Sequence, residues 1–186
     1  MLFLVLYIFC LVATVMAGFL SSRSDFQTMT IPNNMVFVIA IMFLAGFGVA
    51  YLAEVDVFEG ILQHLVAASI VFITTFSLYM MKIIGGGDSK LASAFGLWVG
   101  LGNLMTFIFY WAVFGAVLGF IAIFIRKFKP FGDVLNGEDT GNDNGWLARL
   151  QRGESAVPYA IPITGGALIG MAMAGYFDAQ LMAQFL

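Results

Sequence analysis

The sequence predicts an all-α, polytopic membrane protein with six transmembrane helices and both termini outside. Hydrophobic residues make up 61% of its 186 residues and charged residues only 10%, against about 25% charged in an average soluble domain. The apolar residues are gathered into runs that are long enough to cross a bilayer. Inside a bilayer each backbone amide needs a partner within its own segment, so helices are the expected element.

Five apolar runs have the length of a spanning helix, which needs about 20 residues and tolerates about 17. These runs cover residues 2–20, 35–53, 61–81, 104–125 and 157–177. A sixth, shorter run begins after Asp88 and turns back at about Gly102 and Asn103. The first run has no Lys or Arg before its apolar stretch, so we interpret it as a retained span and not as a secretory signal.

The basic residues indicate that the short run also crosses, because Lys and Arg in short loops stay on the cytoplasmic side. The chain has eight of them: Arg23, Lys82, Lys90, Arg126, Lys127, Lys129, Arg149 and Arg152. Six crossings from an outside start place all eight inside and leave Glu54, Asp56 and Glu59 in an outer loop. No crossing after Lys90 would strand a long apolar segment, and a single crossing would put five bases outside.

Residues 1–186 are expected to form a single membrane domain with a cytoplasmic loop at about 126–156. The end of this loop, WLARLQR, is predicted to form a short interfacial helix with Trp146, Leu147 and Leu150 toward lipid. The stretch GEDTGNDNG inside the loop lacks the alternating ligands and closing Glu of an EF-hand. We therefore expect a solvated turn region there and no metal site.

Composition also excludes several classes of function. The net charge of −3 and the lack of a basic cluster argue against a nucleic acid partner. The single cysteine, Cys10, allows no intrachain disulfide and no Cys-based zinc cluster. The one histidine, His64, falls near the outer end of the third span and is expected to be a packed or interfacial residue. We expect no cofactor.

The stretch IGGGDSKL places Asp88 and Lys90 between two apolar runs, and Asp25 follows the first span at the same predicted cytoplasmic face. Two carboxylates that approach closely share a proton, so one can act as a base toward water and the other as an acid toward a carbonyl. That is the chemistry of aspartic peptide hydrolysis. Glycines before Asp88 would let an extended substrate approach the main chain, and the amides that open the next helix would favour a carboxylate there.

Each aspartate also has a plainer interpretation. Asp is a good helix N-cap, and Gly-Asp-Ser-Lys before an apolar run is how an ordinary helix begins. From Asp88 alone the cap is favoured, and Asp25 alone fits a surface charge in the polar turn SSRSDFQTMT. A phosphate-binding loop is not supported, because the Gly-x-x-x-x-Gly-Lys-Ser/Thr pattern is absent.

Three patches change this balance: Asp25 followed after five residues by Ile-Pro-Asn, the Gly-x-Gly-Asp-x-Lys-Leu block at 85–91, and VPYAIPITGGAL at 157–168. Because it carries these three patches in this order, the sequence resembles the type IV prepilin peptidase family of GxGD membrane aspartic proteases. It is most similar to the short CpaA/TadV-like members of Flp/Tad pilus systems. The resemblance covers essentially the whole chain and implies an aspartyl protease with the catalytic pair Asp25 and Asp88.

The resemblance further implies that Gly85 and Gly87 shape the site, and that Pro32, Asn33 and Lys90 lie beside it. Lys90 has a second interpretation, as a positive residue that anchors the helix at the inner membrane surface. The larger members carry an N-terminal region with paired CxxC motifs and also methylate their product. Only Cys10 occurs here, so methyltransferase activity is not expected.

The implied substrate is a prepilin or pseudopilin with a short basic leader and an apolar N-terminal helix held in the bilayer. The implied location is the bacterial inner membrane, with the site at its cytoplasmic face. A small channel or transporter subunit is the alternative, and it would carry charges deep inside a span. An archaeal-type preflagellin peptidase shares the aspartate pair, but the Asp-x5-Ile-Pro-Asn spacing and the short chain favour the Flp-type enzyme.

Two further features concern packing. Gly115 with Gly119, and Gly166 with Gly170, have the small-xxx-small spacing that lets helices approach closely. We interpret both pairs as packing devices and not as substrate contacts. Pro162 interrupts the last apolar run and is expected to kink the sixth span.

Overall fold

A computed structural model describes residues 1–128, 146–151 and 157–186, and these residues form helices without any strand among them. The helices are α1 (Leu2–Thr28), α2 (Asn33–Leu52), α3 (Ile61–Met80), α4 (Gly86–Val99), α5 (Leu104–Phe128), α6 (Trp146–Gln151), α7 (Ala160–Met173) and α8 (Ala179–Ala183). The all-helical prediction is confirmed. Most of the predicted cytoplasmic loop, including the GEDTGNDNG stretch, lies outside the described residues.

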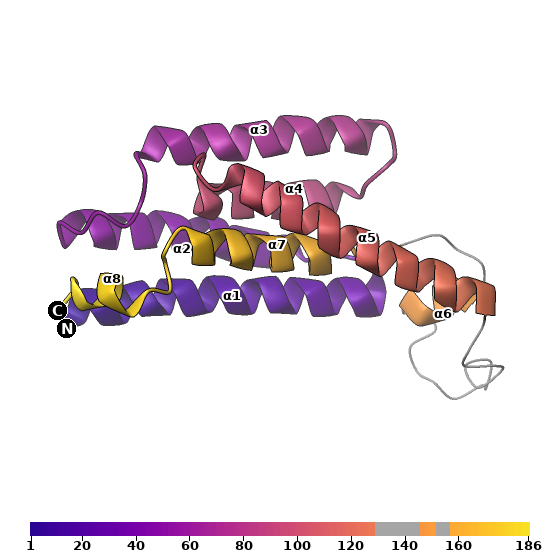
Figure 1. The fold of residues 1–186 in the computed structure, drawn as a ribbon, viewed down its shortest axis with the longest axis horizontal. Coiled ribbons are helices and arrows are strands. Elements are labelled where there is room, and N and C mark those ends of the chain that lie inside the picture. Colours follow the sequence, from indigo (N-terminus) through magenta and orange to yellow (C-terminus); the bar gives the residue numbers. More distant parts are fainter. Residues whose placement is uncertain (129–145, 152–156) are drawn as a thin grey trace.

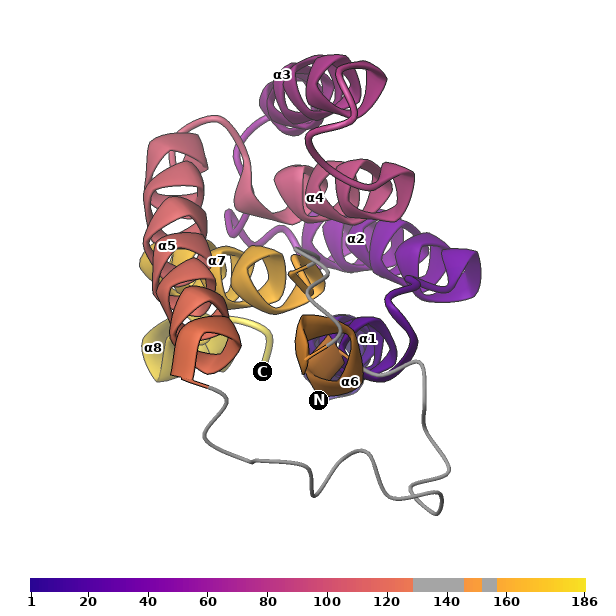
Figure 2. The same cartoon turned by 90° about the vertical axis from the view of Figure 1, so that its right-hand side faces the viewer.

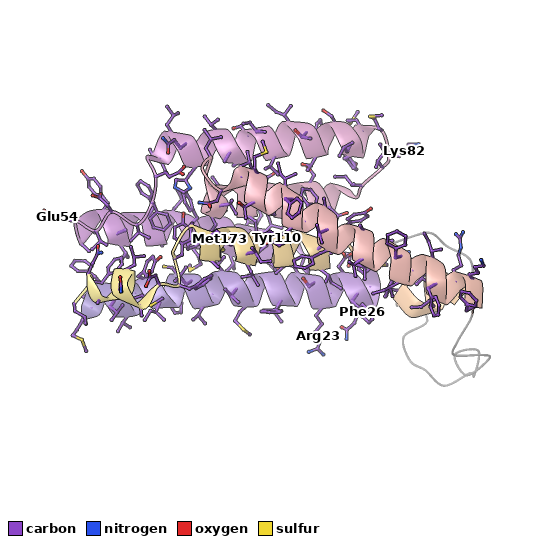
Figure 3. The ribbon with its side chains drawn as sticks, viewed as in Figure 1. Arg23, Phe26, Glu54, Lys82, Tyr110 and Met173 are labelled. Carbon is purple, nitrogen blue, oxygen red and sulfur yellow. The ribbon has the colours of Figure 1, made fainter. Side chains whose placement is uncertain are left out.

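Four helices of the described chain, α1, α2, α3 and α5, are long and apolar enough to cross a membrane. The other two segments that we expect to cross form the shorter helices α4 and α7, each of 14 residues. Both chain termini lie at the same end of the molecule (Figure 1). The basic residues Arg23 and Lys82 lie toward the other end, whereas Glu54 lies at the end of the termini (Figure 3). Six crossings and the orientation in the membrane stay predictions.

The core of the fold is a ring of four helices. Helix α1 packs on α2, α2 on α4, α4 on α7, and α7 back on α1. Helix α3 is added on the outside through α4, and α5 through α7, as Figure 2 shows in the view along the bundle. The ring brings helices from both ends of the sequence together, so the site can draw on residues far apart in the chain.

Large aromatic side chains fill the ring toward the end of the termini. Trp98 of α4 is fully buried, and its indole N–H donates a hydrogen bond to the Ile39 carbonyl at 3.0 Å. Tyr7 of α1 donates to the Tyr176 carbonyl at 3.3 Å. His64 is also fully buried, and its Nδ1 lies 2.6 Å from the Leu97 carbonyl. The prediction of a packed His64 is therefore confirmed.

The glycines divide into two groups. A Cβ atom on Gly166 would lie 2.7 Å from the Trp111 nitrogen, and one on Gly170 would lie 3.2 Å from Val99, so α7 touches its neighbours at these points. A Cβ on Gly119 would meet nothing within 4 Å, and one on Gly115 would make only ordinary contacts. The packing prediction is confirmed for the α7 pair and is wrong for Gly119, which faces open space, whereas Gly115 leaves room for a side chain beside Tyr159 and Pro162.

Two local predictions need correction. The helix predicted in WLARLQR exists as α6, but Trp146 and Leu150 are only 4% and 2% exposed, so they pack inward and not toward lipid. Trp146 lies against the Phe26 ring with a centroid distance of 5.5 Å. The side chain of Leu147 lies outside the described residues. Pro162 occupies the first turn of α7, where its missing N–H breaks no helical hydrogen bond, so no kink is needed.

We expect Gly166→Ala to destabilise the protein, because the new Cβ would press on the backbone of α5. Overpacking of this kind typically costs about 1–3 kcal/mol. Gly119→Ala is the matched control, since the same methyl group enters open space and improves helix propensity by up to about 1 kcal/mol. Thermal unfolding in detergent checks both variants. A Gly166→Ala protein as stable as the wild type would contradict the tight α5–α7 contact.

Candidate active site

Asp25 lies in the last turns of α1 and is buried, with 5% of its surface exposed. Its Oδ2 accepts a hydrogen bond of 3.0 Å from the backbone N–H of Ala160, the first residue of α7. The first N–H groups of a helix have no partner within the helix. The Asp25 carboxyl group therefore satisfies an amide at the start of α7 and ties the end of α1 to it.

Ser22 strengthens this junction one turn before Asp25. Its hydroxyl group lies 3.1 Å from the Ala160 carbonyl and 3.1 Å from the Thr164 hydroxyl. The Thr164 hydroxyl in turn donates to the Gly18 carbonyl at 3.3 Å. The same face of α1 is therefore joined to the first turns of α7 at several points, which limits the positions open to the Asp25 side chain.

Asp88 occupies the third position of α4 and is 8% exposed. Its Oδ2 accepts a hydrogen bond of 3.0 Å from the N–H of Gly85, the residue that precedes the helix. This is the reach-back contact of a capping box, in which the third helical residue satisfies the N-cap amide. Asp88 thus does cap its helix, as the plainer interpretation expected, although from inside the first turn.

The two carboxyl groups belong to one cluster. Asp25 and Asp88 are close enough for their charges to interact. The end of α1 and the beginnings of α4 and α7 lie toward the same end of the bundle, away from the two termini (Figure 1). In each case a helix-end amide donates to Oδ2. The same arrangement leaves the second oxygen of each carboxyl group for other partners.

The glycines before Asp88 mark positions of close approach. A Cβ on Gly85 would lie 2.9 Å from Oδ2 of Asp88, inside any normal contact distance. A Cβ on Gly87 would lie 3.1 Å from the Cβ of Ile31, in the turn between α1 and α2. Side chains here would displace the carboxyl group or the turn. These contacts explain why a glycine-rich entry to α4 fits this site.

Lys90 and Asn33 meet beside the cluster. The Lys90 ammonium donates a hydrogen bond of 3.1 Å to Oδ1 of Asn33, which joins the start of α4 to the start of α2. Pro32 is the residue before α2, in an extended conformation that sets the direction in which the helix begins. The sequence-predicted residues are therefore gathered at one end of the bundle, with the aspartates buried and Lys90 and Asn33 exposed.

Comparison with known proteins decides the family. A family model described as the type IV leader peptidase family matches residues 4–120. The chain belongs to the type IV leader peptidase family. The matched range contains Asp25 and Asp88, whereas the VPYAIPITGGAL patch lies beyond it. No curated protein and no solved structure matched the chain in the corresponding comparisons.

Sequence reasoning singled out the VPYAIPITGGAL patch, which contains the start of α7, but assigned it no contact with Asp25. The structure supplies these contacts, because the Ala160 amide, Ser22 and Thr164 hold Asp25 in place. A backbone N–H leaves no trace in the identity of its residue. The available signal was weaker: Ser22 lies three residues before Asp25, on the same face of a helix.

We expect Gly85→Ala to lower peptidase activity at least tenfold, because the new methyl group would displace the Asp88 carboxyl group. The backbone of Gly85, with φ −76° and ψ 151°, suits any residue, so the effect is steric and local. Gly60→Ala is the matched control: Gly60 precedes α3 in a similar conformation, and its Cβ would meet nothing within 4 Å. The measurement is the cleavage rate of a leader-bearing substrate per amount of folded protein. Equal activity of both variants would refute the proposed crowding.

Proposed function

We propose that this leader peptidase is an aspartic endopeptidase that uses Asp25 and Asp88 to remove the leader of a type IV, Flp-like prepilin. The observation that carries the proposal is the pair itself. Two buried carboxyl groups from helices far apart in sequence interact electrostatically at one end of the bundle. Burying two carboxyl groups in this way costs stability, so such a pair indicates that a function requires it. Carboxyl pairs with perturbed pKa values are typical of catalytic sites.

The geometry fits general acid–base hydrolysis. With one proton shared between the two aspartates, the ionised carboxyl group takes a proton from water while the other donates its proton to the oxygen of the scissile carbonyl. The water oxygen bonds to the carbonyl carbon and gives a neutral tetrahedral diol. When the diol collapses, a diol hydroxyl group gives its proton to the ionised carboxyl group while the protonated one gives its proton to the leaving nitrogen. The C–N bond breaks, the products are a carboxylic acid and an amine, and the pair again holds one proton. No metal ion or covalent intermediate takes part.

The hydrogen bonds that hold one oxygen of each carboxyl group support these acid and base roles. Oδ2 of each aspartate is engaged by a helix-end amide, with N···O distances of 3.0 Å. These contacts fix the carboxyl planes, so that Oδ1 of each group can face the water and the substrate carbonyl. Fixed catalytic groups avoid much of the orientational cost of the reaction. Gly85 and Gly87 act as site-shaping residues in this proposal.

The membrane setting follows from the charge distribution. Arg23 and Lys82 lie at the end of the aspartates, and Glu54 lies at the opposite end (Figure 3). By the positive-inside rule, the aspartate end faces the cytoplasm. The site would then act at the cytoplasmic face of the bacterial inner membrane. A prepilin with a basic leader and an apolar helix would present its scissile bond at that level.

The decisive test is substitution of each aspartate. Asp25→Asn and Asp88→Asn keep an oxygen that accepts the helix-end amide, so both proteins should fold and accumulate normally. Leader cleavage should fall by roughly a thousandfold or more, the scale on which the loss of a catalytic group acts. Asp56→Asn, at an exposed aspartate between α2 and α3, should cleave like the wild type. Gel shift and the mass of the mature N-terminus follow the reaction, and cleavage that survives either site substitution would exclude that aspartate from catalysis.

Inhibitor classes give an independent test. A two-aspartate mechanism should proceed at an unchanged rate in excess EDTA, because its water is activated by a carboxylate and not by a metal ion. Thiol alkylation should likewise leave the rate unchanged, since the single cysteine, Cys10, is only 3% exposed. Initial cleavage rates with and without each reagent provide the measurement. Loss of activity in EDTA that returns with a divalent metal would contradict the proposal.

A further inference from the structure

An apolar groove runs along one side of the bundle, between α2 and α3, with α4 as its floor. It has a volume of about 660 Å³, and Lys90 is the only charged residue among those that line it. Helices α2 and α3 both pack on α4. The groove therefore lies outside the four-helix ring, between α2, which belongs to the ring, and α3, which does not.

The lining residues follow helical spacing on all three walls. They stand at positions 33, 36, 37 and 40 of α2, at 90, 93, 94 and 97 of α4, and at 65, 68, 69, 72 and 73 of α3. The intervals of three, four and seven residues define one face of a helix, and such a face is what a helix presents to another helix. Three faces thus converge on one vacant position. Each covers about two turns, or about 10 Å along the axis.

Small side chains line the groove on both α3 and α4. They are Ala68 and Ser69 of α3 and Ser93 and Ala94 of α4. The Ser69 and Ser93 hydroxyl groups donate to carbonyls of their own helices, at 2.7 Å and 2.6 Å, so neither serine needs a partner from outside. Small residues on helix faces let a neighbouring backbone approach closely in a membrane. The pattern therefore favours a helix as the occupant of the groove.

One end of the groove lies at the same height along α4 as the candidate active site. Lys90 and Asn33 line that end, and Lys90 follows Asp88 by two residues, about 3 Å of helical rise, with its side chain leaving the helix on a different side. The Lys90 ammonium has three donors, and Asn33 takes one of them. An occupant with an acidic or carbonyl oxygen at this level would complement the remaining charge. To reach the carboxyl pair, its main chain would pass around the start of α4, where Gly85 and Gly87 carry no side chain.

We propose that this groove holds the apolar helix of the substrate, with the end nearest the scissile bond beside Lys90. The inference rests on the proposed leader peptidase function and adds the surface that selects the substrate. The first turns of the substrate helix occupy the vacant fourth position beside α2, α3 and α4. The segment before it is extended and enters the carboxyl site. Recognition thus depends on the helix as well as on the leader.

Two serines of α3 provide a matched pair of variants. Ser69 lines the groove and Ser77 does not; both are exposed, and both donate a hydrogen bond of 2.7 Å to the carbonyl four residues earlier. We expect Ser69→Phe to raise KM for a full-length prepilin at least tenfold, because the ring fills the groove, with kcat changed less. Ser77→Phe should stay within twofold of the wild type. A short peptide that spans the cleavage site but lacks the apolar helix should be cut equally by all three proteins.

Disulfide crosslinking tests docking without relying on cleavage. The enzyme carries Cys10→Ala, Asp88→Asn and either Ser69→Cys or Ser77→Cys, and the prepilin carries one cysteine moved through the first three turns of its helix. We expect crosslinks from Ser69→Cys at substrate positions three or four residues apart, and none above background from Ser77→Cys. Melting temperatures of all variants confirm that they fold.

The outcomes separate the two proposals. In one outcome the wild type cleaves the prepilin while Ser69→Phe and Ser77→Phe show the same KM and Ser69→Cys gives no preferred crosslinks. This result would overturn the docking proposal and leave the proposed peptidase function standing. Periodic crosslinks at Ser69→Cys, with no prepilin cleaved by the wild type, would support docking in the groove and contradict the proposed peptidase function. A phospholipid that copurifies with the wild type and Ser77→Phe, but not with Ser69→Phe, would overturn the proposal if no substrate crosslink forms, because the groove would then be a lipid site.

Discussion

The hydrogen bond from the Ala160 amide to the Asp25 carboxyl group is the contact on which the arrangement of the site depends. It joins the first helix of the chain to the last long segment and closes the four-helix ring at the end that carries the aspartates. A hydrogen bond to a charged group contributes about 1.5–3 kcal/mol. The Ser22 hydroxyl contacts add a second fastening at the same junction. With α7 fixed in this way, α4 packs against it and brings Asp88 to the same end.

Both aspartates use the same physical solution to the problem of burial. A carboxylate in an apolar bundle loses its hydration, which is costly unless donors replace the water. Here the donors are backbone N–H groups at the beginnings of α4 and α7, where a helix has unpaired amides and a positive end. The amides gain an acceptor and the carboxyl groups gain a fixed position. Structural capping and a catalytic role are therefore compatible in the same residue, and the two interpretations of Asp88 do not compete.

The sequence predicted the helical class and the gathering of Asp25, Asp88, Gly85 and Lys90 at one end of the bundle. Charge in an apolar chain is rare, so its position carries much information. The directions of apolar side chains could not be predicted in the same way. Lipid and protein neighbours are both apolar, so the sequence did not indicate that Trp146 packs inward or that Gly119 faces open space. The contribution of Ala160 was hidden for another reason, because its backbone amide is common to every residue except proline.

The lengths of the helices have a consequence for the surrounding bilayer. Helices α4 and α7, with 14 residues each, extend for about 21 Å, whereas the hydrocarbon core of a bilayer is about 30 Å thick. Hydrophobic mismatch of this size is relieved by local thinning of the bilayer or by entry of polar groups, at modest cost. The beginnings of these two short helices carry the carboxyl pair. In the proposed six-span arrangement, the mismatch would create a hydrated depression in the membrane at the point where the proposed hydrolysis consumes water.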